Sequence, residues 1–165
     1  MLRLLLLLIP SLAIAGMQED TDYIANNLYK VAYVHTALKQ DWEGVPQLFL
    51  TDAVTNLTVD FLKDEVHSQR PDKSGNDSFP SGHTSDVFAP SFYIYQRYGL
   101  VESLPYFVLS TYVGYARVQM DKHNPEDVAA SILLSYGMSK LFAGEAPPIG
   151  VTWNDGLTFR FFKEF

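Results

Sequence analysis

Apolar residues recur at helical spacing over much of the chain. The clearest example is a helix expected to end between Lys63 and His67, whose apolar stripe is formed by Leu50, Val54, Leu57 and Phe61. Residues 23–38 predict a second amphipathic helix. The apolar runs 104–116 and 128–139 predict core helices, because neither reaches the roughly 20 apolar residues needed to span a bilayer.

Two helix starts are marked by capping residues. Ser81 is a predicted N-cap, with Gly82 and His83 in the first turn of the helix that follows. Asn124 is the second predicted N-cap, with Pro125 at the first helical position. The sequence therefore predicts two helix N-termini, each next to residues that can take part in a chemical reaction.

The pattern changes beyond Gly144. Apolar residues on either side of Asn154-Asp155-Gly156 predict a short hairpin, with strands at 151–153 and 157–162. The expected fold class is thus all-α: a compact bundle of about five principal helices, followed by a short C-terminal β-hairpin or extended tail.

The first residues are typical of an export signal. Arg3 supplies a positive charge, residues 4–15 are mostly apolar, and Ala13-Ile14-Ala15 fits a cleavage site, so the mature chain is expected to start near Gly16. An uncleaved segment that anchors the chain to a membrane is the alternative. Because the sequence contains no cysteine and thus no disulfide framework, the periplasm of a Gram-negative bacterium is the expected compartment.

The rest of the chain has the size of one domain. Residues 16–165 show no linker or repeat and are expected to form a single unit, with the motif-bearing core at 50–142 and a tail at 144–165. The net charge of −7 argues against nucleic acid as a partner. Any anion site must therefore be a local cluster of cations on an acidic protein.

Three short segments contain the residue types that phosphoryl transfer requires. In chain order they are Lys63 with Arg70-Pro71, then Pro80-Ser81-Gly82-His83, then Arg117 with His123 and Asp127. Lysine and arginine neutralise phosphate, imidazoles attack phosphorus or move protons, and a carboxylate can orient an imidazole. Singly, Ser81 would be an ordinary N-cap and Asp127 a helix-start carboxylate; their joint occurrence indicates a phosphate site.

At these residues the chain resembles the type 2 phosphatidic acid phosphatase (PAP2) superfamily, which includes bacterial non-specific acid phosphatases, lipid phosphate phosphatases and vanadium haloperoxidases. All three family segments occur in order and with their internal spacing intact, and the resemblance spans residues 50–142. One departure is Ala116, which stands before Arg117 where the family usually has serine. The missing hydroxyl could reduce activity.

The resemblance implies a role for each residue. His123 is the implied nucleophile, forming a phosphohistidine, with Asp127 fixing its tautomer and His83 as the general acid. The implied phosphate ligands are Lys63, Arg70, Ser81, Gly82, His83 and Arg117. Neither a metal ion nor another cofactor is expected. His35 and His67 have no place in the pattern and are interpreted as ordinary histidines.

Three functions remain open from the sequence. A phosphatase acting on phosphate monoesters, lipid phosphates or diphosphates is favoured; a vanadium-dependent haloperoxidase would use the same residues, and a non-catalytic phosphate-binding relative would need only the cations. The expected partner is a phosphate-ester substrate, soluble or lipid, with peripheral membrane contact as an option and no membrane span in the mature chain. The substrate and the oligomeric state are not specified by these motifs.

Overall fold

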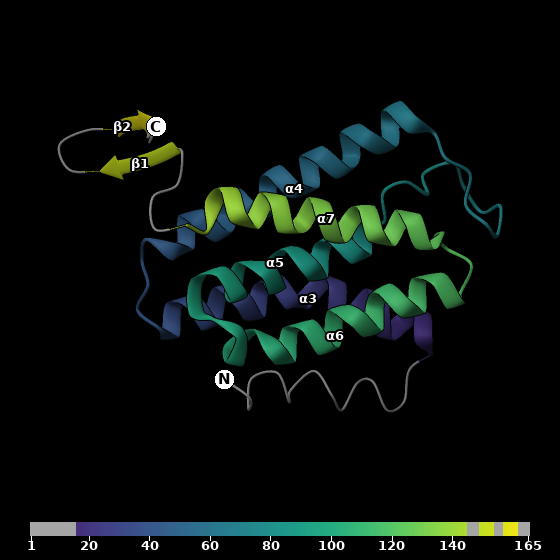
Figure 1. The fold of residues 1–165 in the computed structure, drawn as a ribbon, viewed down its shortest axis with the longest axis horizontal. Coiled ribbons are helices and arrows are strands. Elements are labelled where there is room, and N and C mark those ends of the chain that lie inside the picture. Colours follow the sequence, from purple (N-terminus) through teal and green to yellow (C-terminus); the bar gives the residue numbers. More distant parts are fainter. Residues whose placement is uncertain (1–15, 145–148, 154–156, 162–165) are drawn as a thin grey trace.

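The computed structural model describes residues 16–144, 149–153 and 157–161. Its helices are α3 (Met17–Leu38), α4 (Gly44–Val66), α5 (Gly82–Tyr98), α6 (Leu100–Gln119) and α7 (Pro125–Phe142), shown in Figure 1. The predicted export signal lies outside the described residues. The all-α prediction is confirmed by these five helices.

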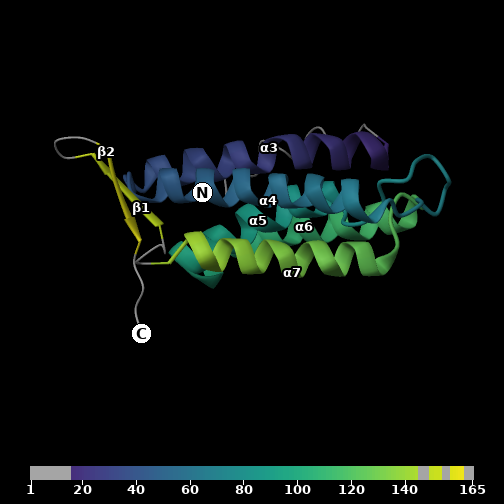
Figure 2. The same ribbon diagram turned by 90° about the horizontal axis from the view of Figure 1, so that it is seen from above.

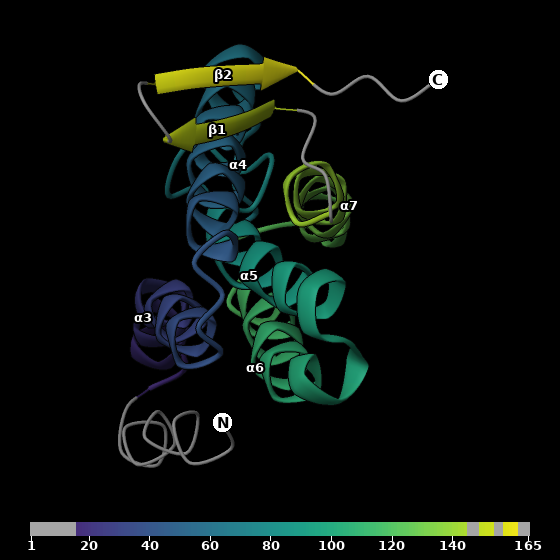
Figure 3. The ribbon, with the colours of Figure 1, turned by 90° about the vertical axis from the view of Figure 1, so that its left-hand side faces the viewer.

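Helix α5 lies at the centre of the bundle. It contacts each of the other four helices, and the end-on view shows α3, α4, α6 and α7 arranged around it (Figure 3). The buried core is built from side chains on α3, α5 and α6 and one leucine of α4, among them Ile24, Leu28, Leu48, Val87, Tyr93, Tyr106 and Val113. Because α5 is enclosed on several sides, its first turn is held firmly in place.

Serines allow α7 to pack closely on α5. Ser131, Ser135 and Ser139 are fully buried along one side of α7. The Ser131 hydroxyl donates to the backbone carbonyl of Ser81 at 2.9 Å, which ties the middle of α7 to the N-cap of α5. Small side chains permit close helix approach, and these hydroxyls also satisfy backbone carbonyls. The two predicted helix starts are therefore fixed to one another.

Helix α4 buries a different face from the one its apolar stripe suggests. Leu57 and Phe61 are 68% and 62% exposed, whereas Thr51, Thr55 and Val59 are buried. The periodic stripe correctly predicted a helix, but Leu50 and Val54 are only half-buried and the rest of the stripe points to solvent. The side that packs inward is formed by Gly44, Gln47, Leu48, Thr51, Thr55 and Val59.

The C-terminal hairpin is present. Strands β1 (Ile149–Trp153) and β2 (Leu157–Phe161) pair antiparallel, with Val151 opposite Phe159. The first strand begins two residues before the predicted start, and the predicted Asn154-Asp155-Gly156 turn lies outside the described residues.

Among the described residues, no helix is both long and apolar enough to cross a membrane.

Candidate functional site

The three predicted segments meet at one end of the bundle. Helices α4 and α6 end there, while α3, α5 and α7 begin there, as the right-hand side of Figures 1 and 2 shows. Lys63 lies in the last turn of α4 and Arg117 in the last turn of α6. Two cations thus lie at the same end of the bundle as the starts of α5 and α7, whose positive dipole ends also favour an anion.

Asp77 organises the first two cations. Its carboxylate accepts hydrogen bonds from Nε and Nη2 of Arg70, both at 2.8 Å, in a bidentate pair. Lys63 Nζ lies 3.6 Å from the same carboxylate and donates to the backbone carbonyl of Asp77 at 2.8 Å. Burial lowers the pKa of Lys63, since the charged form is partly desolvated. A loop carboxylate therefore holds both cations in place.

Arg117 is buried and incompletely satisfied. Its side chain is only 2% exposed, and its Nε–H has no hydrogen-bond partner among the described residues. The Nη1 atom donates to Gln18 Oε1 at 3.3 Å and lies 3.9 Å from an oxygen of Asp22. Burial lowers the pKa of this guanidinium, with Arg70 adding to the effect. A buried guanidinium with an unused donor is suited to receive an anion.

His123 is held by the backbone rather than by Asp127. Its Nδ1 lies 2.7 Å from the carbonyl oxygen of Ser78, whereas the nearest Asp127 oxygen is 3.9 Å away. A carbonyl can only accept, so the proton is on Nδ1 and the lone pair is on Nε2. The structure therefore corrects the implied partner: Ser78 fixes the tautomer of His123.

Asp127 supports this arrangement from behind. Its Oδ2 accepts hydrogen bonds from the Ser78 hydroxyl at 2.6 Å and from the Asn124 backbone N–H at 2.8 Å. Asn124 is the N-cap of α7 and Pro125 its first residue, as predicted. Asp127 thus positions Ser78, and the carbonyl of Ser78 in turn holds the imidazole of His123.

The surroundings of His123 favour the neutral ring. Burial lowers the pKa of His123 to about 4, opposed by the hydrogen bond to the Ser78 carbonyl and assisted by the positive charges of Arg117, Arg70 and Lys63. A neutral imidazole is a nucleophile, whereas an imidazolium is not. The cations that would hold a phosphate therefore also keep its attacking group unprotonated.

The Ser-Gly-His turn begins α5 as predicted. Ser81 is the N-cap, but its hydroxyl is buried and accepts a hydrogen bond from Thr84 at 2.8 Å. Gly82 and His83 are the first residues of α5, so their N–H groups have no partner within the helix and can donate to an anion. A side chain at Gly82 would lie within 4.0 Å of Lys63, which places the turn against that cation.

His83 contacts a helix that the motifs do not include. Its Nε2 lies 2.7 Å from Oδ1 of Asp22, which lies in the second turn of α3. Burial lowers the pKa of His83, and Arg117 adds to this, while the hydrogen bond and charge of Asp22 oppose both. The two site histidines therefore have different partners: His123 a neutral carbonyl, His83 a carboxylate.

Sequence reasoning missed four contributors to the site: Gln18, Asp22, Asp77 and Ser78. Ser78 and Asp77 were visible only as part of a glycosylation-like Asn-Asp-Ser triplet. Gln18 and Asp22 share one side of α3 at a four-residue spacing, which is the only signal they carry. Ala116, beside Arg117, is fully buried.

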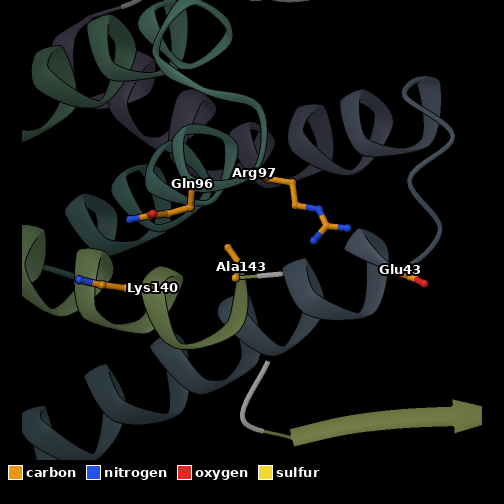
Figure 4. A pocket seen from close by; sticks show the side chains of 6 residues that line it. Glu43, Gln96, Arg97, Lys140 and Ala143 are labelled. Atoms are coloured by element: carbon orange, nitrogen blue, oxygen red, sulfur yellow. The ribbon is translucent and has the colours of Figure 1, made fainter. Parts of the chain in front are cut away.

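A hollow lies at the end of the bundle opposite the candidate site. It has a volume of about 520 Å³, and its lining includes Glu43, Arg97 and Lys140 (Figure 4). Arg97 is already paired with Asp41 through two hydrogen bonds of 2.6 and 2.7 Å. None of the predicted catalytic residues lines this hollow. Among the described residues, no cluster of three or more His, Asp or Glu side chains is arranged to hold a metal ion.

Comparison with known proteins agrees with the motifs. A family model described as the PAP2 superfamily matches residues 45–144. The chain is 29% identical over 125 residues to a lipid A 1-phosphatase of Rhizobium johnstonii, an alignment that covers 65% of this chain and 49% of the relative. The chain thus spans about half the length of that curated relative. No solved structure matches the chain.

Proposed function

The chain belongs to the PAP2 superfamily, whose family model matches more than half of its length, and we propose that it is a metal-independent phosphatase. It hydrolyses phosphate monoesters through a phosphohistidine on His123. The observation that carries this proposal is the setting of His123: its buried ring holds Nδ1 at 2.7 Å from the Ser78 carbonyl, which leaves Nε2 for attack, and burial and three nearby cations lower its pKa.

The proposed reaction has two steps. In the first, Nε2 of His123 attacks phosphorus, the bond from phosphorus to the ester oxygen breaks, and protonated His83 gives its proton to the departing alkoxide. In the second, water attacks the phosphohistidine, its proton goes to His83, and the phosphorus–nitrogen bond breaks to release inorganic phosphate. The enzyme then has its starting protonation state.

The cations neutralise the charge of the transferring group. Arg70 and Arg117 present guanidinium forks that match phosphoryl oxygens, and Lys63 adds a point charge. The unused Nε–H of Arg117 gains a partner when phosphate binds. Because these donors are fixed before substrate arrives, they stabilise developing charge without reorganisation. This arrangement supports catalysis without a divalent ion.

Lipid phosphates are the proposed substrate class. The similar protein from Rhizobium is named for its action on lipid A, and α4, whose last turn contains Lys63, carries exposed apolar side chains. An exposed apolar surface on a helix that also supplies a phosphate ligand suits a substrate with acyl chains. The test is a panel of detergent-dispersed lipid phosphates and soluble phosphomonoesters, with higher kcat/KM expected for the lipids.

The sharpest test of the mechanism replaces the nucleophile. His123→Ala should abolish turnover and the acid-labile, base-stable label that ³²P-substrate leaves on the protein. His67→Asn is the matched control, because His67 is exposed, lies at the C-cap of α4 in the left-handed region (φ 49°), and asparagine tolerates that conformation. Wild-type protein that turns over substrate but never carries the label would contradict the covalent route.

Metal dependence separates the proposal from its alternatives. Activity should persist in EDTA and be inhibited by vanadate, which can mimic five-coordinate phosphorus on His123. A strict requirement for Mg²⁺ or Zn²⁺ would overturn the mechanism. Halide oxidation by the vanadate-loaded protein with peroxide would instead support a haloperoxidase, and phosphate binding without turnover would support a non-catalytic relative.

Export is proposed from the pattern of residues 1–15 alone. N-terminal sequencing of protein expressed in a Gram-negative host tests it. The expected result is a periplasmic chain that starts near Gly16, and a membrane-bound chain that retains Met1 would support the anchor instead.

A further inference from the structure

Asp22 connects helix α3 to the end of the bundle where the three motif segments meet. Its Oδ1 lies 2.7 Å from Nε2 of His83 and 3.9 Å from Nη1 of Arg117. One carboxylate oxygen thus lies beside both the proposed general acid and a proposed phosphate ligand. This contact joins residues 61 positions apart in the sequence, and no family segment includes Asp22.

Gln18 holds Asp22 in this position. The Gln18 amide donates to both carboxylate oxygens, at 2.8 and 2.9 Å, while its own carbonyl oxygen accepts from Arg117 Nη1 at 3.3 Å. Gln18 and Asp22 therefore form a hydrogen-bonded pair on α3 that contacts Arg117 and His83. The Asp22 side chain is still 43% exposed, so changing it does not open a buried cavity.

The contact determines which nitrogen of His83 is free. A carboxylate can only accept, so Nε2 carries a proton that it donates to Asp22. No hydrogen bond joins Nδ1 to any residue in the described part of the chain. Nδ1 is therefore the nitrogen available to a substrate oxygen. An imidazole held this way has the arrangement of a histidine whose far nitrogen is oriented by an acid.

Resting on the proposed phosphatase function, we propose that Asp22 is the positioning residue of the general acid: it holds Nε2–H of His83, directs Nδ1 to the leaving group, and stabilises the protonated ring. In the first step the Nδ1 proton passes to the ester oxygen as the phosphorus–oxygen bond breaks. His83 becomes neutral, and its other proton stays on Nε2, hydrogen-bonded to Asp22. In the second step Nδ1 takes a proton from the attacking water.

The charges around His83 make this carboxylate important. The groups that face the ring are Asp22 from α3, Arg117 from α6 and Arg70 from the α4–α5 connection. Two of the three are cations, and they disfavour the protonated ring that a general acid needs. Asp22 is the one anion among them, so its removal leaves His83 with positive neighbours alone.

The test compares Asp22→Asn with wild type on two substrates. An alkyl phosphate needs its leaving oxygen protonated, whereas p-nitrophenyl phosphate releases a stable anion. We expect kcat to fall by about tenfold or more for the alkyl substrate and by less than about threefold for the aryl one, with the alkaline limb of kcat/KM moved down by about one pH unit. Asp22→Glu should retain most of the wild-type kcat on the alkyl substrate and keep the alkaline limb near its wild-type position.

Glu126→Gln is the matched control. Glu126 is an exposed carboxylate in the first turn of α7, at the same end of the molecule, so its removal changes net charge equally without touching His83. This variant should leave the alkaline limb in place. Equal losses on both substrates with no pH shift in Asp22→Asn would assign a merely structural role. A lower KM with an unchanged limb would make Asp22 a competitor of phosphate. Either result overturns the proposal.

A measurement without turnover separates this inference from the function. The pKa of His83 can be followed by NMR of its ring protons in the free protein, with the signal assigned by its loss in His83→Gln. We expect this pKa to be lower by about one unit in Asp22→Asn and unchanged in Glu126→Gln. No shift would overturn the coupling even in an active enzyme. A clear shift in a protein that hydrolyses nothing would support the coupling and contradict the proposed function.

Discussion

At the scale of single residues, the site depends on two histidines held in different ways. His123 donates to a neutral carbonyl and is surrounded by cations, so it is kept unprotonated. His83 donates to the carboxylate of Asp22, which favours its protonated form against the nearby arginines. A nucleophile must be neutral and a general acid must be charged. The surroundings of His123 favour its neutral form, whereas for His83 only Asp22 favours the charged form, against burial and Arg117, which lower its pKa.

The pH dependence of catalysis should reflect this difference. Because the pKa of His123 is about 4, kcat/KM should hold its value down to about pH 4 before protonation removes the nucleophile. The alkaline limb should lie below pH 6.5, the usual pKa of histidine, because the pKa of His83 is lowered by burial. The measurement is a pH profile of kcat/KM with a soluble alkyl phosphate, whose leaving oxygen needs the proton of His83.

Bound substrate should shift the acid limb. A phosphate dianion beside His123 stabilises the imidazolium, so the pKa that governs kcat should be higher than the one that governs kcat/KM. An acid limb of kcat/KM near pH 6.5, the ordinary histidine value, would show that burial does not control His123. His83→Gln is the control, since it should lose the alkaline limb and retain the acid one.

The proposed site residues were easier to predict from the sequence than the partners that hold them. Lys63, Arg70 and Arg117 could be predicted, because each belongs to a segment with fixed spacing. Asp22 and Ser78 could not, because their contacts with His83 and His123 join residues 61 and 45 positions apart and involve no local motif. The contact between His123 and Asp127 was implied by the family resemblance, and Nδ1 of His123 instead lies 2.7 Å from the backbone carbonyl of Ser78.

At the scale of helices, periodicity and caps identified the elements but not every buried face. The predicted starts at Ser81 and Asn124 are confirmed because N-cap and proline chemistry is local. The inward face of α4 combines apolar residues with Gly44, Gln47 and two threonines, so hydrophobic periodicity alone does not identify it. Which side of an amphipathic helix is buried depends on what packs against it, and that information is spread along the chain.

Two glycines provide a paired test of helix packing. A Cβ at Gly44, the first residue of α4, would lie 2.6 Å from both an oxygen of Asp41 and the hydroxyl of Tyr93. Neither neighbour yields easily, because Arg97 holds Asp41 and the Tyr93 hydroxyl donates to the Gly44 carbonyl. Gly44→Ala should therefore lower the free energy of unfolding by about 1–3 kcal/mol.

Gly137→Ala should have the opposite effect. Gly137 lies within α7, and no atom lies within 4 Å of a Cβ added there. Alanine is favoured over glycine in a helix interior by about 0.5–1 kcal/mol, so the variant should be more stable by about that amount. Urea unfolding of both variants measures the pair. An unchanged free energy of unfolding in Gly44→Ala would mean that α4 can shift to admit the methyl group. The close approach of its first turn would then not contribute to stability.

At the scale of the whole molecule, cations and apolar surface are distributed unevenly. The chain has a net charge of −7, yet Lys63, Arg70 and Arg117 gather at one end of the bundle. The exposed apolar side chains of α4, including Leu57 and Phe61, lie close in sequence to Lys63 at that end. The proposed preference for lipids requires the acyl chains of a substrate bound at the cations to reach this apolar surface of α4.

Substituting this surface should separate lipid from soluble substrates. In Leu57→Ser/Phe61→Ser, two exposed side chains become polar, so folding is expected to be retained while contact with acyl chains is lost. We expect kcat/KM to fall by about fivefold or more on a detergent-dispersed lipid phosphate and to stay within about twofold on p-nitrophenyl phosphate. Val101→Ser/Leu104→Ser is the matched control, because these residues are 82% and 51% exposed at the start of α6, the end of that helix away from Arg117. Equal lipid activity in all three proteins would mean that α4 takes no part in substrate recognition, and the preference for lipids would then have to come from the phosphate site itself.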